Sequence, residues 1–112
     1  MDIHIDECSN ALVISVAGKI DASNSTEIEK EIAASTATVQ KIVILDLQGL
    51  EYMSSAGLRV VLISAKNLKA KKQDLLISGL QGPVKDVFEL SGFYSIFKIF
   101  PTLEEALNSI GS

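Results

Sequence analysis

Residues 42–62, IVILDLQGLEYMSSAGLRVVL, decide the fold class of this chain. Residues 42–47 are apolar apart from Asp46, which is the pattern of a central strand covered on both faces. A short loop follows, and from Leu58 onward apolar residues recur at helical spacing. A buried strand, a loop and an amphipathic helix in this order predict one crossover unit of an α/β fold.

The N-terminal segment predicts an antiparallel hairpin. Residues 2–7 alternate apolar and polar side chains, as in a strand with one exposed face. Ser9 and Asn10 form a turn signal, and a more buried strand over residues 12–17 follows it.

After this hairpin, helices alternate with strands, so the chain predicts a mostly parallel mixed sheet of about five strands, with four crossover or flanking helices. The fold class is therefore α/β. The remaining predicted strands cover residues 75–78 and 95–100, and helices are predicted over residues 22–36, 83–91 and 103–110. A further helix is predicted to begin at Ser54 and Ser55, with Gly57 in its first turn, and to continue through Leu68.

Each predicted helix has a cap signal and an apolar stripe. Asp21, Ser23 or Asn24 can cap the first helix, and Thr102 with Glu105 forms the pattern of a capping box for the last. The stripes expected to face the core are Ile28, Ile32 and Ala33; Leu58, Val61, Leu62, Ala65 and Leu68; Val84, Val87 and Phe88; and Leu103, Ala106, Leu107 and Ile110.

Length and charge limit the function classes. The 112 residues fit one domain, 1–112, and a net charge of −4 argues against nucleic-acid binding. No apolar run reaches the roughly 20 residues that span a bilayer, and the start lacks the pattern of a signal peptide. Cys8 is the single cysteine. We therefore expect a cytoplasmic protein without membrane insertion, disulfide, metal or cofactor.

Catalytic machinery is not evident in the sequence. His4, the one histidine, lies on the first predicted strand, and no Gly-x-Ser-x-Gly elbow or glycine-rich phosphate loop is present. Four lysines crowd the end of the second helix, where cations suit the negative end of the helix dipole; that interpretation is favoured over a binding patch. They are Lys66, Lys69, Lys71 and Lys72.

Ser54 and Ser55 are the strongest functional candidates, because they follow the carboxyl end of the predicted central strand, where open α/β sheets bind their ligands. Two interpretations stay open at this point. Ser54 can be a helix N-cap with Ser55 an ordinary first-turn residue, or a hydroxyl is presented for phosphorylation. Gly57 lies in the same turn, where a glycine lowers helix stability by about 0.5–1 kcal/mol relative to alanine. Its presence there indicates that another group approaches the backbone closely at this end of the helix.

These residues also carry a family resemblance. Residues 45–58, LDLQGLEYMSSAGL, resemble the signature of the STAS-domain anti-sigma factor antagonists of bacteria. Residues 18–22, GKIDA, are similar to the family segment before the first helix, and residues 76–97 are similar to the family's C-terminal half. The resemblance covers essentially the whole chain.

The resemblance implies a phosphorylation switch. By this match Ser55 is the phosphoacceptor of an anti-sigma factor that is itself a serine kinase, and a PP2C-type phosphatase reverses the modification. The unphosphorylated protein binds the anti-sigma factor, which frees sigma factor; the free protein is expected to be a monomer. Ser54 stands where the family usually has Asp. The residues expected at the partner surface are Asp21, Asn24, Ser54, Ser55, Gly57, Leu58 and Arg59.

Two alternatives to this function remain. One keeps the fold but makes the chain a non-phosphorylated scaffold subunit of a transporter or a stress-signalling complex. The other is a small hydrolase or transferase that uses Ser55, for which the sequence positions no general base.

Overall fold

The computed structural model describes residues 2–111 as one mixed six-stranded sheet with four α-helices. The ends of the expected domain, residues 1 and 112, lie outside the described residues. The strands are β1 Asp2–Glu7, β2 Ala11–Ile20, β3 Ile42–Asp46, β4 Leu50–Met53, β5 Leu75–Ser78 and β6 Lys98–Phe100. The helices are α1 Ser25–Thr36, α2 Ser55–Ala70, α3 Gly82–Leu90 and α4 Leu103–Ser109, with a 3-10 turn, η1, at Phe93–Ser95.

The sheet has the predicted hairpin and parallel crossovers. Its order is β1-β2-β3-β5-β6, with β1 antiparallel to β2 and the other neighbours parallel. β4 pairs with the far end of β2, beyond an irregularity at Gly18 and Lys19. Gly18 has φ +87°, and its N–H donates to the carbonyl of Gly49 at 3.0 Å, so β2 bends there and exchanges β3 for β4 as its partner.

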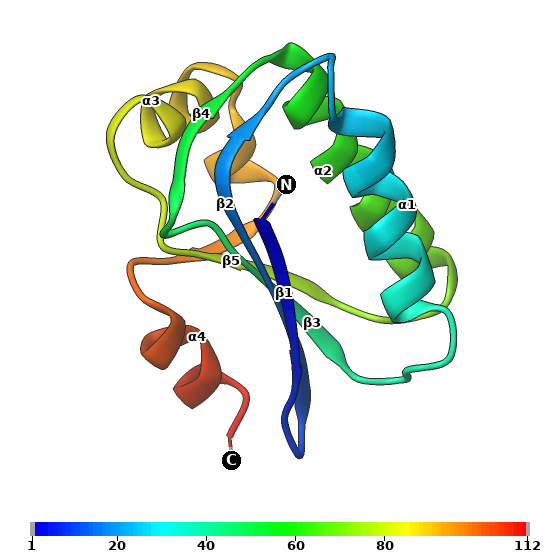
Figure 1. Ribbon diagram of the computed structural model, residues 1–112. Helices are drawn as coiled ribbons and strands as arrows, with labels where there is room; N and C mark the ends of the chain where they lie inside the picture. The colour runs from blue at the N-terminus through cyan, green and yellow to red at the C-terminus, as the bar shows by residue number, and fades with distance from the viewer. Residues whose placement is uncertain (1, 112) are drawn as a thin grey trace.

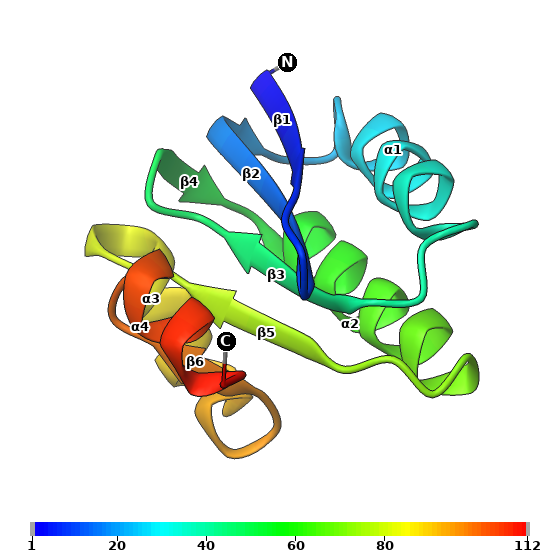
Figure 2. The ribbon, with the colours of Figure 1, turned by 90° about the horizontal axis from the view of Figure 1, so that it is seen from below.

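Helices cover both faces of the sheet. The larger core lies under α1, α2 and α3, where Ile28, Val61 and Phe88 pack on β2, β3 and β5. A smaller core on the other face joins Ala106 of α4 to Val13 and Ile44. Figure 1 shows α1 and α2 side by side, and Figure 2 shows α4 across the strands from them.

The α/β class, the hairpin and the four helices are confirmed, whereas several details of the prediction are wrong. β4 was expected to be loop, and the strand predicted over 95–100 is only the three residues of β6 after η1. The buried stripe of α1 contains Thr36 instead of Ala33. The Thr36 hydroxyl donates to the carbonyl of Ile32 at 2.9 Å, so this polar side chain is buried with its hydrogen bond made.

The stripe of α2 is rotated relative to the prediction. Its buried residues include Gly57 and Ser64, which an apolar pattern cannot detect, and Val60. Leu62 was expected to face the core but is 43 % exposed. The outward face of α2 therefore runs through Leu62.

The ends of two helices also differ from expectation. Asn24 occupies the N-cap position of α1, but no side chain caps this helix, because the Asn24 amide is used elsewhere in the loop. Thr102 caps α4, with its Oγ1 accepting from the N–H of Glu105 at 3.1 Å. The predicted capping box is therefore half formed: among residues 2–111, no bond joins the Glu105 side chain to the N–H of Thr102.

Candidate functional site

Ser54 ends the loop after β4 and caps α2. Its Oγ accepts from the N–H of Ala56 at 3.2 Å, and its carbonyl accepts from Gly57 at 2.9 Å. Its own N–H donates to the carbonyl of Ile20 at 2.9 Å, so both backbone polar groups and the hydroxyl are engaged. Ser54 thus fixes the start of α2 against the end of β2, as a cap residue does.

Ser55 is the first residue of α2, and its side chain is exposed. The first turn of α2 contains no acidic residue, so nothing within it compensates the positive end of the helix dipole. An anion attached at Ser55 would meet this favourable field. The two hydroxyls thus differ in their surroundings: that of Ser54 accepts the capping bond and is partly buried, whereas that of Ser55 is exposed.

Gly57 explains how α2 approaches the sheet so closely. A Cβ built on Gly57 would lie 2.6 Å from Cγ of Met53 and 3.1 Å from Cγ2 of Ile20. Both neighbours are buried core residues. The close approach inferred from the sequence is thus made by the protein's own β2 and β4 ends, and Gly57 lies beneath the surface rather than on it.

The loop between β2 and α1 is tied by two side chains. Asn24 accepts from the N–H of Asp21 through Oδ1 at 2.9 Å and donates through Nδ2 to the carbonyl of Lys19 at 2.8 Å. Oδ1 of Asp21 accepts from the N–H of Ser23 at 2.9 Å and from its hydroxyl at 2.5 Å. The two residues give this loop a defined shape.

These bonds also set the charge of the loop. The Ser23 hydroxyl and N–H, with a smaller contribution from the Lys19 ammonium 3.5 Å from Oδ2, hold the pKa of the Asp21 carboxyl below its ordinary value of 3.8. Asp21 is therefore ionised at neutral pH. Because Asp21 directly follows Ile20, whose carbonyl receives the Ser54 N–H, a fixed negative charge is anchored in the loop next to the start of α2.

An open hollow of about 570 Å³ borders Ser55. On the α2 side, Ser55, Ala56 and Arg59 line it, and Leu58 points away from it toward the core. Arg59 follows Ser55 by four residues, so the two exposed side chains share one face of the helix. The α1 side contributes Ser25, Thr26 and Glu29. No pattern in the sequence indicates these three residues, because their approach depends on how α1 packs on α2.

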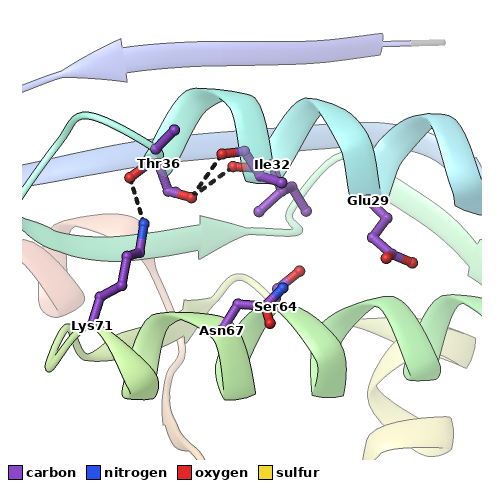
Figure 3. A pocket seen from close by; sticks show the side chains of 8 residues that line it. Glu29, Ile32, Thr36, Ser64, Asn67 and Lys71 are labelled. Carbon is purple, nitrogen blue, oxygen red and sulfur yellow. Dashed lines mark hydrogen bonds between the residues drawn. The ribbon is translucent and has the colours of Figure 1, made fainter.

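A second hollow, of about 300 Å³, continues along the groove between α1 and α2 from Glu29 (Figure 3). Lys71 closes its far end, where its Nζ donates to the carbonyl of Thr36 at 2.7 Å. Ser64 and Asn67 line its α2 wall. Lys71 thus joins the ends of the two helices and is not an unpaired surface cation.

The other chemically active side chains do not gather at Ser55. His4 pairs with Ser15 in the β1–β2 ladder, and among residues 2–111 no hydrogen bond joins its side chain to Ser54 or Ser55. Cys8 lies at the hairpin turn, where its carbonyl accepts from Lys41. Residues 2–111 hold no group of three or more His, Cys, Asp or Glu side chains suited to a metal ion.

No helix within the described range 2–111 has the length and apolar character needed to cross a membrane.

The candidate site consists of the two serines, the β2–α1 loop and the hollow beside Ser55. Of the expected partner residues, the structure brings Asp21, Asn24, Ser54, Ser55, Gly57, Leu58 and Arg59 together at the start of α2 and the adjoining loop, with Gly57 and Leu58 facing inward.

Comparisons with known proteins find similarity along almost the whole chain. A family model described as the STAS domain matches residues 2–106. The anti-sigma factor antagonist BtrV of Bordetella bronchiseptica is 39% identical over 106 residues, which cover 95% of this chain and 91% of BtrV.

Solved structures of anti-sigma factor antagonists have the same fold as this chain. An anti-sigma factor antagonist from Mycobacterium paratuberculosis superposes with a TM-score of 0.88 at 24% identity, covering 99% of this chain and 94% of that one. The antagonist SpoIIAA in its unphosphorylated form gives a TM-score of 0.81 at 22% identity, covering 97% and 96% of the two chains.

Proposed function

The chain belongs to the STAS domain family, and from this premise we propose that it is an anti-sigma factor antagonist that is switched off by phosphorylation of Ser55. In this proposal the unphosphorylated protein binds an anti-sigma factor that is a serine kinase, and sigma factor is released. A PP2C-type phosphatase restores the active form. The relative BtrV, which carries the name of an anti-sigma factor antagonist, supports the proposal across nearly the full length of both chains.

The observation that carries the proposal is the different state of the two serine hydroxyls. The Ser54 hydroxyl is engaged as the cap of α2, whereas the Ser55 side chain is exposed beside the open hollow. A kinase needs a hydroxyl that can be reached in line with a bound nucleotide, and the hollow leaves space for that approach. Ser55 is accordingly the favoured acceptor.

Phosphorylation would act through charge and not through refolding. A phosphoserine carries about −1.5 to −2 charges at neutral pH. The N-terminus of α2 and Arg59 one turn later would favour such a charge, whereas Glu29 on the α1 side of the hollow would oppose it. A partner surface that covers the neutral serine must instead desolvate the phosphate. A penalty of about 3 kcal/mol weakens binding by roughly a hundredfold, which suffices for a switch.

The test is phosphate transfer from ATP by the purified cognate anti-sigma factor, followed by mass spectrometry of the digested product. We expect one phosphate on Ser55, no phosphate on Ser55→Ala, and normal incorporation into Ser54→Ala. Because Ser54→Ala removes a cap, circular dichroism must first show that this variant is folded at the assay temperature. Phosphate on Ser54, retained in Ser55→Ala, would contradict the assignment.

Sigma release provides the second readout. Unphosphorylated wild-type protein and Ser55→Ala should both displace sigma factor from the anti-sigma factor, and only the wild type should lose this activity after incubation with ATP. A chain that binds the anti-sigma factor without displacing sigma factor would instead favour the scaffold function.

A further inference from the structure

A second surface of α2, distinct from the Ser55 hollow, has no role in the switch described so far. It is a groove of about 390 Å³ between α2 and the segment that joins η1 to β6. Leu62 and Ile96, which are 43 % and 62 % exposed, stand on its two sides. Phe97 lies deeper in the groove, where its ring meets that of Phe93 edge-on at 5.4 Å between centroids. The apolar part of the groove therefore rests on the core.

The groove has a positively charged border. Lys66 and Lys69 line it on α2, and no carboxylate among residues 2–111 lies within ion-pairing distance of either. Asp74, at one end, is the single acidic residue that lines it. Residues 52–73 contain five basic residues and no acidic one. Since the whole chain has a net charge of −4, the remainder carries −9, and the positive charge is concentrated on α2 and the turn after it.

The helix dipole accounts for Lys69 in this border but not for Lys66. Its effect is confined to the last turn of a helix, where Lys69 lies, and Lys66 is a turn further from the end of α2 at Ala70. Exposed apolar side chains with a polar or charged rim are a feature of protein-binding surfaces.

The groove is also continuous with the face that carries Ser55. Ser55, Arg59, Leu62, Lys66 and Lys69 are spaced by three or four residues, and all five are exposed, so they form one stripe along the outer face of α2. At 1.5 Å per residue, Leu62 lies about 10 Å from Ser55 along the helix and Lys66 about 16 Å.

We propose that this groove binds an acidic amphipathic helix of the anti-sigma factor, with apolar side chains between Leu62 and Ile96 and carboxylates against Lys66 and Lys69. This inference rests on the proposed function. A helix fits better than an added strand, because the neighbouring edge strand, β6, has only three residues and offers few backbone hydrogen bonds.

The distance from Ser55 gives the groove a separate role. The Debye length at physiological ionic strength is about 8 Å, so a phosphate on Ser55 is largely screened from Lys66. The groove then acts as an anchor whose strength does not depend on phosphorylation, and the Ser55 end acts as the switch. Such an anchor keeps the kinase near its substrate after the switch contact is lost.

The test is isothermal titration calorimetry, which measures the affinity of the purified cognate anti-sigma factor for the groove variants and for matched controls. Leu62→Gln/Ile96→Gln and Lys66→Glu/Lys69→Glu should each weaken binding by about tenfold or more, as truncation of interface anchors does. Leu90→Gln, at an apolar residue that is 89 % exposed elsewhere, and Lys30→Glu/Lys85→Glu should bind as the wild type does. Circular dichroism checks that every variant is folded.

The groove variants are then combined with Ser55→Asp. The losses in binding free energy should add, because the two contacts are independent. If the groove variants bind like the wild type while Ser55→Asp binds weakly, the groove inference is wrong and the proposed function stands. If the wild type itself does not bind the anti-sigma factor, both are wrong. The groove variants are also tested on anionic phospholipid vesicles. If the wild type binds these vesicles, and the variants lose this binding but keep wild-type affinity for the anti-sigma factor, the groove binds a membrane and the inference is wrong.

Discussion

Replacing Gly57 by alanine is expected to destabilise the fold and move the start of α2. The added Cβ would lie 2.6 Å from Cγ of Met53, whereas carbon atoms in good contact are about 3.5–4.0 Å apart. Cβ and Cγ2 of Ile20, at 3.2 and 3.1 Å, block a shift toward β2. Relief therefore requires movement of roughly 1 Å by Met53 or by the first turn of α2.

The magnitude follows from two opposing effects. Overpacking a well-packed core costs about 1–3 kcal/mol, and replacing glycine by alanine in a helix returns about 0.5–1 kcal/mol. The return is at its smallest in a first turn, so a net loss of about 1–2 kcal/mol is expected, which lowers the midpoint of thermal unfolding by about 4–10 °C for a domain of this size.

The assay is chemical denaturation of Gly57→Ala, Met53→Ala and the double variant. Met53→Ala removes the Cγ atom that the new methyl group would strike, so the two losses should not add, and the double variant should be more stable than their sum predicts by about 1 kcal/mol or more. A Gly57→Ala protein as stable as the wild type, or strictly additive losses, would show that the close approach at Gly57 does not limit the packing of α2.

Further expectations follow from single features of the structure. Ser54→Ala should lower the free energy of unfolding by about 0.5–2 kcal/mol through loss of the α2 cap, measured by denaturation. Ser55→Asp should bind the anti-sigma factor less tightly than wild type, but more tightly than the phosphorylated protein, because it carries about half the charge. Deleting residues 102–112 removes α4 from the smaller core and should cause aggregation, detected by light scattering. Because the fold lowers the pKa of Asp21 below 3.8, its contribution to stability is present above that pH and lost as the pH falls through the lowered value; an NMR titration of the carboxyl and the Asp21→Asn variant check this.

The regular elements could be predicted because their signals are local. Apolar alternation in residues 2–7, the continuous run of β3 and the Thr102 cap each lie within a few residues. β4 has no such signal: its pairing with β2 depends on the bend at Gly18, far away in sequence. The rotation of α2 was missed for a similar reason, since Gly57 and Ser64 face the core through close packing and not through apolar character.

The candidate site was predictable only in part. The pair Ser54–Ser55, its place at a helix start and a cap at Ser54 were visible in the sequence, and the bond from Ala56 to Ser54 confirms the cap. The role of Ser55 as acceptor stays a prediction. The hollow beside Ser55 and the groove at Leu62 were not predictable, because α1 and the segment before β6 supply half of their walls. Surfaces built by separate segments have no signature in any one of them.

Ser54 stands where the family usually has aspartate, and this difference is consistent with the proposed phosphorylation switch at Ser55 for an electrostatic reason. An aspartate before Ser55 would place a carboxylate beside the phosphate and use part of the favourable field at the start of α2. With serine there, the cap is kept by a neutral hydroxyl, and the first turn has no negative charge before modification. A phosphate on Ser55 would then be the first negative charge within this turn, although the ionised Asp21 lies in the adjoining loop. In the proposed function, the N-terminus of α2 offsets part of the added charge, and the cost of the phosphate falls on the surface that must cover it.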